Sequence, residues 1–142
     1  MAYIGEHMRE TIRVRAGRRC EYCLEPEKMS FARHQVDHVI AEKHGGATVL
    51  ENLALCCTLC NRRKGSDLSA LDPVGGELRA LFNPRADRWA DHFELWGGEI
   101  VARSGAGRVT IKLLQLNRPD RIKERAALVQ SGWLWTRGGR DE

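Results

Sequence analysis

The cysteines are the residues whose types and spacing point most directly to chemistry. Cys20 and Cys23 form one Cys-x-x-Cys pair, Cys57 and Cys60 form a second, and Cys56 is the fifth cysteine. Two such pairs can place four thiolates tetrahedrally around one zinc ion. We therefore expect a structural zinc site at these four residues, with Cys56 as a small buried apolar residue.

Two other uses of cysteine fit this pattern less well. Disulfides are rare in the cytoplasm, which is the compartment we expect because residues 1–10 do not form the apolar core of a signal peptide. A redox Cys-x-x-Cys motif usually occurs once in a chain and would explain only half of the pattern. Structural zinc explains both pairs.

The spacing between the two pairs indicates an inserted functional segment. Between Cys23 and Cys57 lie 33 residues, whereas a zinc ribbon has about 15–20. The insert carries the adjacent acid and base Asp37 and His38, and histidine, with a pKa of about 6.5, suits general-base catalysis at neutral pH. We expect His34, in the same segment, to lie at a solvated strand start.

The elements that must position these residues follow from periodicity and turn signals. Alternation over residues 36–40 predicts a strand, Gly45-Gly46 a turn, and Asn52 to Leu55 a second strand. Residues 58–64 predict a short helix that ends at Gly65. The result is a ββα arrangement clasped by zinc.

This ordered set of residues resembles the zinc-containing HNH endonucleases. The resemblance covers about residues 15–66 and rests on these features in family order: Cys20-x-x-Cys23, Val36-Asp37-His38-Val39-Ile40, Gly45-Gly46, Asn52-Leu53, Cys57-x-x-Cys60-Asn61 and Lys64-Gly65. It implies an α+β fold with a ββα-metal (HNH) core. It also implies a metal-dependent endonuclease that hydrolyses DNA phosphodiester bonds.

The resemblance further implies a role for each matching residue. Asp37 would bind a catalytic divalent cation, His38 would be the general base, Asn52 would orient the histidine, and Asn61 would be a second metal ligand. Carboxylate and amide oxygens suit Mg²⁺ or Mn²⁺, and such a cation offsets the negative charge of the transition state. Each of these residues alone is more commonly structural.

Composition is consistent with DNA as the partner. The net charge is +4 with a sequence pI near 9.0, and 18 of the 23 basic residues are arginine, whose planar fork suits phosphate. Arg62, Arg63 and Lys64, after the second cysteine pair, are candidate phosphate contacts, although basic residues at a helix end are often only solvated. No stretch is apolar enough to span a membrane.

We divide the chain into an HNH core with an N-terminal helix (1–66) and a C-terminal extension (67–142) packed as part of the same compact unit. The core helix is expected over residues 6–17. In the extension, residues 66–76 look like a linker, and residues 77–82 predict a helical turn. A β-hairpin with arms near 89–96 and 99–103 should follow, then helices over 109–116 and 120–130.

Two other classes of protein would explain part of this pattern. A noncatalytic zinc module that binds nucleic acid, or a protein-interaction domain that needs zinc only for folding, would account for the cysteines and the charge. Neither accounts for Asp37 and His38 together with Asn52 and Asn61. The sequence leaves open whether the protein is a monomer or a homodimer.

Overall fold

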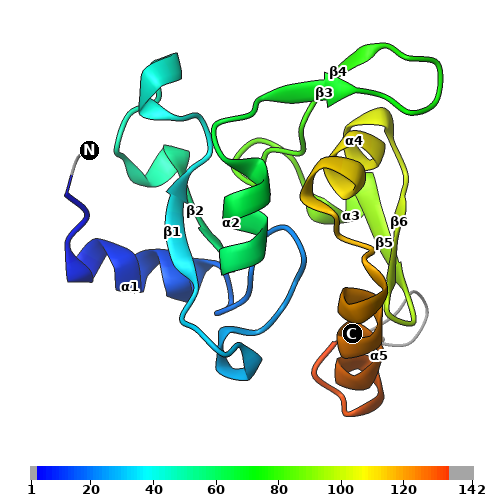
Figure 1. Cartoon of the computed structure of the whole chain (residues 1–142). Helices are drawn as coiled ribbons and strands as arrows, with labels where there is room; N and C mark the ends of the chain where they lie inside the picture. Colours follow the sequence, from blue (N-terminus) through cyan, green and yellow to red (C-terminus); the bar gives the residue numbers. More distant parts are fainter. Residues whose placement is uncertain (1–2, 135–142) are drawn as a thin grey trace. The chain divides into compact units, whose positions relative to one another are not determined.

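The computed structural model describes residues 3–134 and shows a mixed α+β chain built from short helices and small antiparallel hairpins (Figure 1). Contacts along the chain divide it into two compact units. Unit 1 holds residues 1–66 together with 83–86, and unit 2 holds residues 67–82 together with 87–142. The sequence-based prediction that the extension packs as part of one compact body stays a prediction.

Unit 1 contains the two-stranded sheet and helix that the sequence predicts between and after the cysteine pairs. Its elements, in chain order, are α1 (Glu6–Arg15), η1 (Glu27–Met29), β1 (Gln35–His38), η2 (Glu42–His44), η3 (Leu50–Asn52), β2 (Leu53–Cys56) and α2 (Thr58–Lys64). Strands β1 and β2 are antiparallel, with Asp37 opposite Ala54 and His38 opposite Leu53. The ββα order predicted from the sequence is therefore confirmed.

The apolar core of unit 1 forms between α1 and β2. Ile12 from α1 is fully buried with Leu53 and Leu55 from β2, and Met8 and Ala16 pack against them at helical spacing. All four side chains of β2 are buried, which is typical of a strand covered on both faces. This packing fixes the strand that pairs with β1 and so supports the segment that carries Asp37 and His38.

Unit 2 is made of two further hairpins and three helices. Its elements are β3 (Ser69–Leu71), β4 (Leu78–Ala80), α3 (Trp89–His92), β5 (Phe93–Trp96), β6 (Glu99–Ala102), α4 (Gly105–Leu114) and α5 (Pro119–Gln130). Strand β3 pairs with β4, and β5 pairs with β6, both antiparallel. The predicted C-terminal hairpin and helices are thus present.

The sequence-based prediction was wrong for residues 66–82, which form a hairpin rather than a linker followed by a helical turn. Gly75 and Gly76 both have positive φ, 90° and 77°, a conformation that glycine adopts without the steric cost of a side chain. This turn brings residues 78–80 back along 69–71. Asp72 accepts a hydrogen bond from the Val74 backbone inside the turn, at 2.9 Å.

Two helix boundaries also differ from those predicted. Helix α4 begins at Gly105, four residues before the predicted start, because the Ser104 hydroxyl caps it by accepting from the Gly107 backbone at 3.0 Å. Residues 89–92, predicted as part of a hairpin arm, form the short helix α3 before β5 begins.

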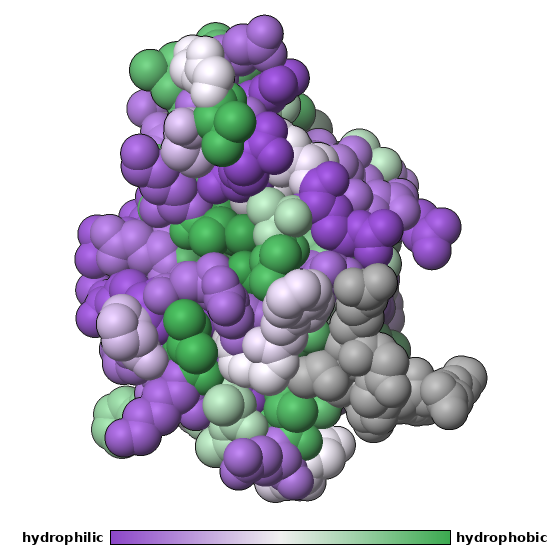
Figure 2. Space-filling model, turned by 90° about the vertical axis from the view of Figure 1, so that its right-hand side faces the viewer, coloured by the Kyte–Doolittle hydropathy of each residue, from purple (hydrophilic) through white to green (hydrophobic). Residues whose placement is uncertain are grey.

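Hydrophilic residues predominate on the face drawn in Figure 2, with hydrophobic residues in smaller groups between them. Within residues 3–134, no helix is long and apolar enough to cross a membrane.

Candidate metal centre and nuclease site

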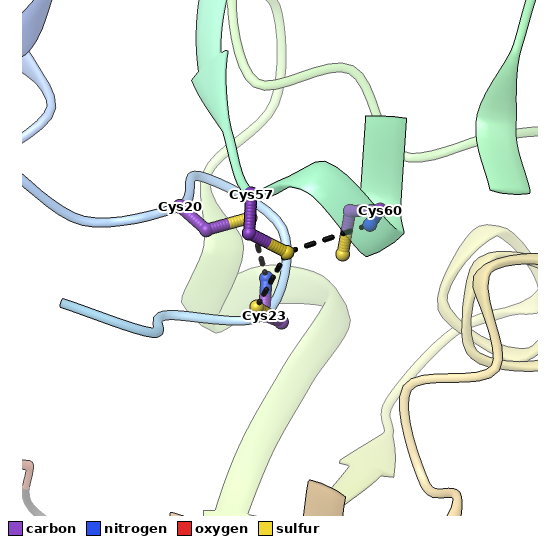
Figure 3. A group of neighbouring side chains, drawn as sticks. All are labelled: Cys20, Cys23, Cys57 and Cys60. Atoms are coloured by element: carbon purple, nitrogen blue, oxygen red, sulfur yellow. Dashed lines mark hydrogen bonds between the residues drawn. The ribbon is translucent and has the colours of Figure 1, made fainter. Parts of the chain in front are cut away.

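The four cysteines of the two Cys-x-x-Cys pairs meet at one point. Their sulfur atoms all lie within 4.8 Å of one another, and the Cys23 and Cys57 sulfurs are 3.7 Å apart. A zinc ion with four Zn–S bonds of about 2.3 Å separates its sulfur ligands by about 3.8 Å, so the donor set fits a tetrahedral zinc site. Figure 3 shows the four side chains converging from two segments of the chain.

Local backbone geometry holds the sulfurs in place. The Cys23 backbone N–H donates to the Cys20 sulfur, and the Cys60 N–H donates to the Cys57 sulfur, each at 3.4 Å. Cys57 is also the N-cap of α2, so the helix begins at the metal site. All four residues are buried. Burial, with hydrogen bonding among the thiols, raises the pKa of Cys20 well above its usual value, so metal binding must displace its proton.

Cys56 lies outside this cluster, as predicted. It is fully buried at the end of β2 and is not one of the four grouped residues. Burial, together with the nearby Asp37 charge, raises the pKa of its thiol well above the usual range. A protonated, buried thiol behaves as a small apolar side chain.

Asp37 lies on β1, where it faces α2. Its carboxylate Oδ2 is 3.4 Å from the Lys64 Nζ, and the Lys64 ammonium also donates to the His38 carbonyl at 3.3 Å. Lys64 is 2% exposed, so its ammonium contacts internal oxygens, unlike the exposed Arg62 and Arg63 beside it. Burial raises the pKa of Asp37, and the Lys64 charge opposes this shift.

Asn61 lies on α2 one turn before Lys64 and contacts the face of β1 that carries Asp37. Its Nδ2 donates to the Gln35 side-chain Oε1. Gln35 and Asp37 share a face of the strand because they are two residues apart, and Asn61 and Lys64 share a face of the helix. Two side-chain contacts, Asn61 with Gln35 and Lys64 with Asp37, therefore bring the predicted metal ligands to one interface between β1 and α2. Because Asn61 uses its Nδ2 to donate this hydrogen bond to Gln35, its Oδ1 can act as an acceptor or a metal ligand.

His38 is buried at the end of β1, with 8% exposure. Its Nε2 lies 2.8 Å from the Thr48 hydroxyl, and that hydroxyl donates to Glu42 Oε2 at 3.4 Å. In the tautomer that carries the proton on Nε2, the Thr48 oxygen accepts from His38 and its hydroxyl proton points to Glu42. That tautomer leaves a lone pair on Nδ1. Thr48 and Glu42 were missed by sequence reasoning, which had no signal linking a loop threonine to the histidine.

Asn52 braces the loop between β1 and β2 through hydrogen bonds to the backbone of that loop. Its Oδ1 accepts from the Ile40 N–H at 3.0 Å, and its Nδ2 donates to the carbonyls of Ile40 and Ala47, each at 2.9 Å. Gly46 is required in this loop because a Cβ there would lie 1.7 Å from the Ile40 carbonyl oxygen. Asn52 thus fixes both sides of the loop that carries Thr48.

The prediction that His34 lies at a solvated strand start was wrong. It is 3% exposed, and its Nε2 lies 2.8 Å from the Glu25 carbonyl oxygen. An isolated antiparallel bridge between Arg19 and Pro26 closes the loop that contains the first cysteine pair, and Glu25 lies in that loop. Alternation along the strand could not predict this contact with a carbonyl nine residues earlier in the chain.

Residues 83–86, which were assigned to the C-terminal extension, contact the loop that carries the first cysteine pair. Arg85 forms an ion pair with Glu21, which lies between Cys20 and Cys23. Glu21 also accepts from the Leu55 backbone at 2.9 Å. Asn83 shapes the segment by accepting from the Arg85 N–H at 2.8 Å. Residues 83–86 therefore belong to unit 1 through specific contacts.

Comparison with known proteins agrees with the resemblance drawn from the sequence. Residues 20–67 match the family model for HNH endonuclease. No curated protein and no solved structure was found to match the chain. The match covers only this stretch, which also carries the four cysteines positioned to hold a metal ion, and it agrees with the predicted family. The mixed helices and antiparallel hairpins confirm the predicted α+β fold class.

Proposed function

We propose that the protein is a metal-dependent endonuclease that hydrolyses phosphodiester bonds of DNA. The observation that carries the proposal is the contact of His38 Nε2 with the Thr48 hydroxyl at 2.8 Å, which suits the tautomer in which Nδ1 can accept a proton. Histidine in this form can deprotonate a water molecule that attacks phosphorus. The HNH domain match over residues 20–67 supports a nucleic acid substrate.

Two different metals are proposed. Cys20, Cys23, Cys57 and Cys60 would hold structural zinc. Asp37 and Asn61 would hold an exchangeable Mg²⁺ or Mn²⁺ ion through oxygen atoms, and that ion would supply positive charge at the phosphate. Lys64 contacts one Asp37 oxygen at 3.4 Å, so its charge favours the anionic carboxylate against the effect of burial and helps to orient it.

The remaining residues of the site position the base and the DNA. Asn52 holds the loop from Ile40 to Thr48 through three hydrogen bonds, and so sets the position of the hydroxyl that orients His38. Arg62 and Arg63 are exposed on α2 and would contact phosphates. The burial of Lys64 assigns it to Asp37 in this proposal rather than to DNA. The cytoplasmic location and the oligomeric state stay open to measurement.

A plasmid-nicking assay tests the proposal. Supercoiled DNA should be converted to nicked circles with Mg²⁺ or Mn²⁺, and EDTA should stop the reaction. Thr48→Val should slow cleavage because Nε2–H loses its acceptor, whereas Arg103→Gln, an exposed arginine in unit 2, should cleave normally. Binding of DNA with no nicking under any divalent ion would instead support a noncatalytic zinc module.

A further inference from the structure

A basic-aromatic loop lies between the first cysteine pair and β1. We define it by the exposed side chains of Lys28, Met29, Phe31 and Arg33. Phe31 is fully exposed, and Met29 is 44% exposed. Single exposed apolar residues are ordinary on protein surfaces, but here two lie in one short segment between two cations. This combination of side chains calls for a specific partner.

Hydrogen bonds that involve buried residues hold the ends of this loop, so its exposed side chains project from an ordered segment. Glu27 Oε2 accepts from the His34 backbone N–H at 2.9 Å and from Arg13 Nε at 3.3 Å. His34 itself is buried, with Nε2 near the Glu25 carbonyl oxygen at 2.8 Å. Both ends of the loop are thereby tied to the body of unit 1. The fold presents Phe31 outward from a fixed base.

The charge of the loop selects the class of partner. Its exposed charged groups are the cations Lys28 and Arg33, and the Arg33 side chain is 71% exposed. The neighbouring acid, Glu27, is only 13% exposed and contacts Arg13 and the His34 backbone. Its Oε2 also lies 3.8 Å from the Arg33 Nε, but the Arg33 side chain stays largely exposed to solvent. A partner must therefore offer negative charge together with a flat apolar face. Nucleic acid offers both, as phosphates and bases.

We propose that the basic-aromatic loop is a second DNA contact, in which Phe31 stacks on a nucleotide base while Lys28 and Arg33 contact flanking phosphates. The proposal rests on the nuclease function proposed above. Phe31 precedes Asp37 by six residues, which an extended chain spans in at most about 22 Å. At about 3.4 Å per nucleotide, the stacked base lies within about six nucleotides of the cleaved bond.

Stacking on Phe31 requires a base with an accessible face. A single strand offers such faces directly, whereas a duplex must be partly unstacked to admit an aromatic wedge. The loop therefore favours DNA that is single-stranded or easily unstacked next to the cleavage point. Both forms of DNA would offer the same feature, an exposed base face. The experiment below therefore measures binding to single-stranded and to duplex DNA separately.

The test measures binding of full-length zinc-loaded protein to a single-stranded and a duplex oligonucleotide, each carrying a fluorescent adenine analogue that reports stacking. Phe31→Ala should weaken binding about 5- to 150-fold in at least one arm, the range that base–aromatic stacking supports. Phe31→Trp should retain binding because it keeps the aromatic face. Arg33→Gln should lower the salt dependence of binding by about one phosphate contact.

Tyr3→Ala is the matched control, because Tyr3 is another strongly exposed aromatic residue of unit 1 (89%). It should bind DNA like the wild type. Equal binding by Phe31→Ala and wild type in both arms would overturn the proposal, as would equal losses in Phe31→Ala and Phe31→Trp. Wild-type protein that neither binds nor cuts DNA would instead show that the proposed function itself is wrong.

Discussion

The Lys64 ammonium lies 3.4 Å from the Asp37 carboxylate across the interface between α2 and β1, and only 3% of the Lys64 side chain is exposed. The partner that Lys64 meets is the residue proposed to bind the catalytic cation. Removing one member of a buried ion pair leaves the other charge uncompensated, so this contact links the stability of the ββα unit to its proposed chemistry.

The Lys64–Asp37 contact predicts a stability effect. Lys64→Met should lower the free energy of unfolding by about 1–3 kcal/mol, because Asp37 loses its charged partner in a partly buried site. The measurement is urea unfolding of the zinc-loaded protein at pH 7. Arg63→Gln, one residue earlier and exposed, is the control and should change stability by no more than about 0.5 kcal/mol.

A double variant separates the pair from general packing. Asp37→Asn combined with Lys64→Met removes both charges, and its loss of stability should be smaller than the sum of the two single losses. Additive losses would show that the two side chains do not interact.

The metal site predicts a sharp difference between adjacent cysteines. The purified protein should contain about one zinc per chain. Cys57→Ser should lose the zinc and unfold, since Cys57 is both a member of the four-sulfur cluster and the N-cap of α2. Cys56→Ser should keep the zinc. Metal content by mass spectrometry checks this, and equal zinc loss in both variants would overturn the choice of ligands.

Much of the four-cysteine cluster and of the ββα order could be predicted because the signals are local. The spacing of the cysteines identifies each Cys-x-x-Cys pair. The alternation of apolar and polar residues, together with the Gly45-Gly46 turn, predicts the strands. The partners of Asp37 and His38 were not predictable in this way. Lys64 is 27 residues from Asp37 in the sequence, and Thr48 is 10 residues from His38. Lysine and threonine side chains suit the solvated surface as well as a buried hydrogen bond, so residue type alone did not indicate these contacts. Position along α2 favoured phosphate binding for Lys64, and only packing shows its burial.

Residues 66–82 show a second reason why sequence-based prediction failed. Their Pro and Gly content is typical of a linker, but Asp72 organises the segment. Its carboxylate is fully buried and accepts from Arg108 at 2.8 and 2.9 Å and from Arg79 at 3.2 Å. A contact between residues 36 positions apart leaves no periodic trace in the sequence. The buried Asp72 carboxylate organises this hairpin, and its short strands show no extended alternating apolar pattern in the sequence.

Asp72 predicts how unit 2 responds to acid. Hydrogen bonds from Arg108, then from the Val74 backbone, hold the pKa of Asp72 far below its usual value. A depressed carboxyl pKa stabilises the fold above the unfolded-state pKa of about 4, and that stability is lost as pH falls through the lower folded-state pKa. Asp72→Asn should therefore be less stable than wild type at pH 7, and the difference should shrink below about pH 4.

Thermal unfolding followed by circular dichroism from pH 7 to pH 2 provides the measurement. Asp67→Asn, an exposed acid outside this cluster, is the matched control and should follow the wild-type curve. A constant difference between Asp72→Asn and wild type across this range would contradict the assigned role of the carboxylate.

Asn52 predicts a loss of activity through the loop that it braces. Asn52→Ala removes three hydrogen bonds to Ile40 and Ala47 and should cost about 1–3 kcal/mol of stability. Cleavage should fall by less than in a variant that lacks the base, because His38 remains. Single-turnover rates measured beside urea unfolding check both effects. Wild-type stability together with lost cleavage would indicate that Asn52 acts directly in the reaction.

The most direct test of the central claim is the single-turnover cleavage rate of His38→Ala with saturating protein and Mg²⁺ or Mn²⁺. This variant keeps Asp37, Asn61 and the cysteine cluster, so it should fold, hold zinc and bind DNA like the wild type. Its cleavage rate should fall by about 10²- to 10⁴-fold, the usual contribution of general-base catalysis. A His38→Ala protein that cuts DNA at the wild-type rate would contradict the proposed mechanism.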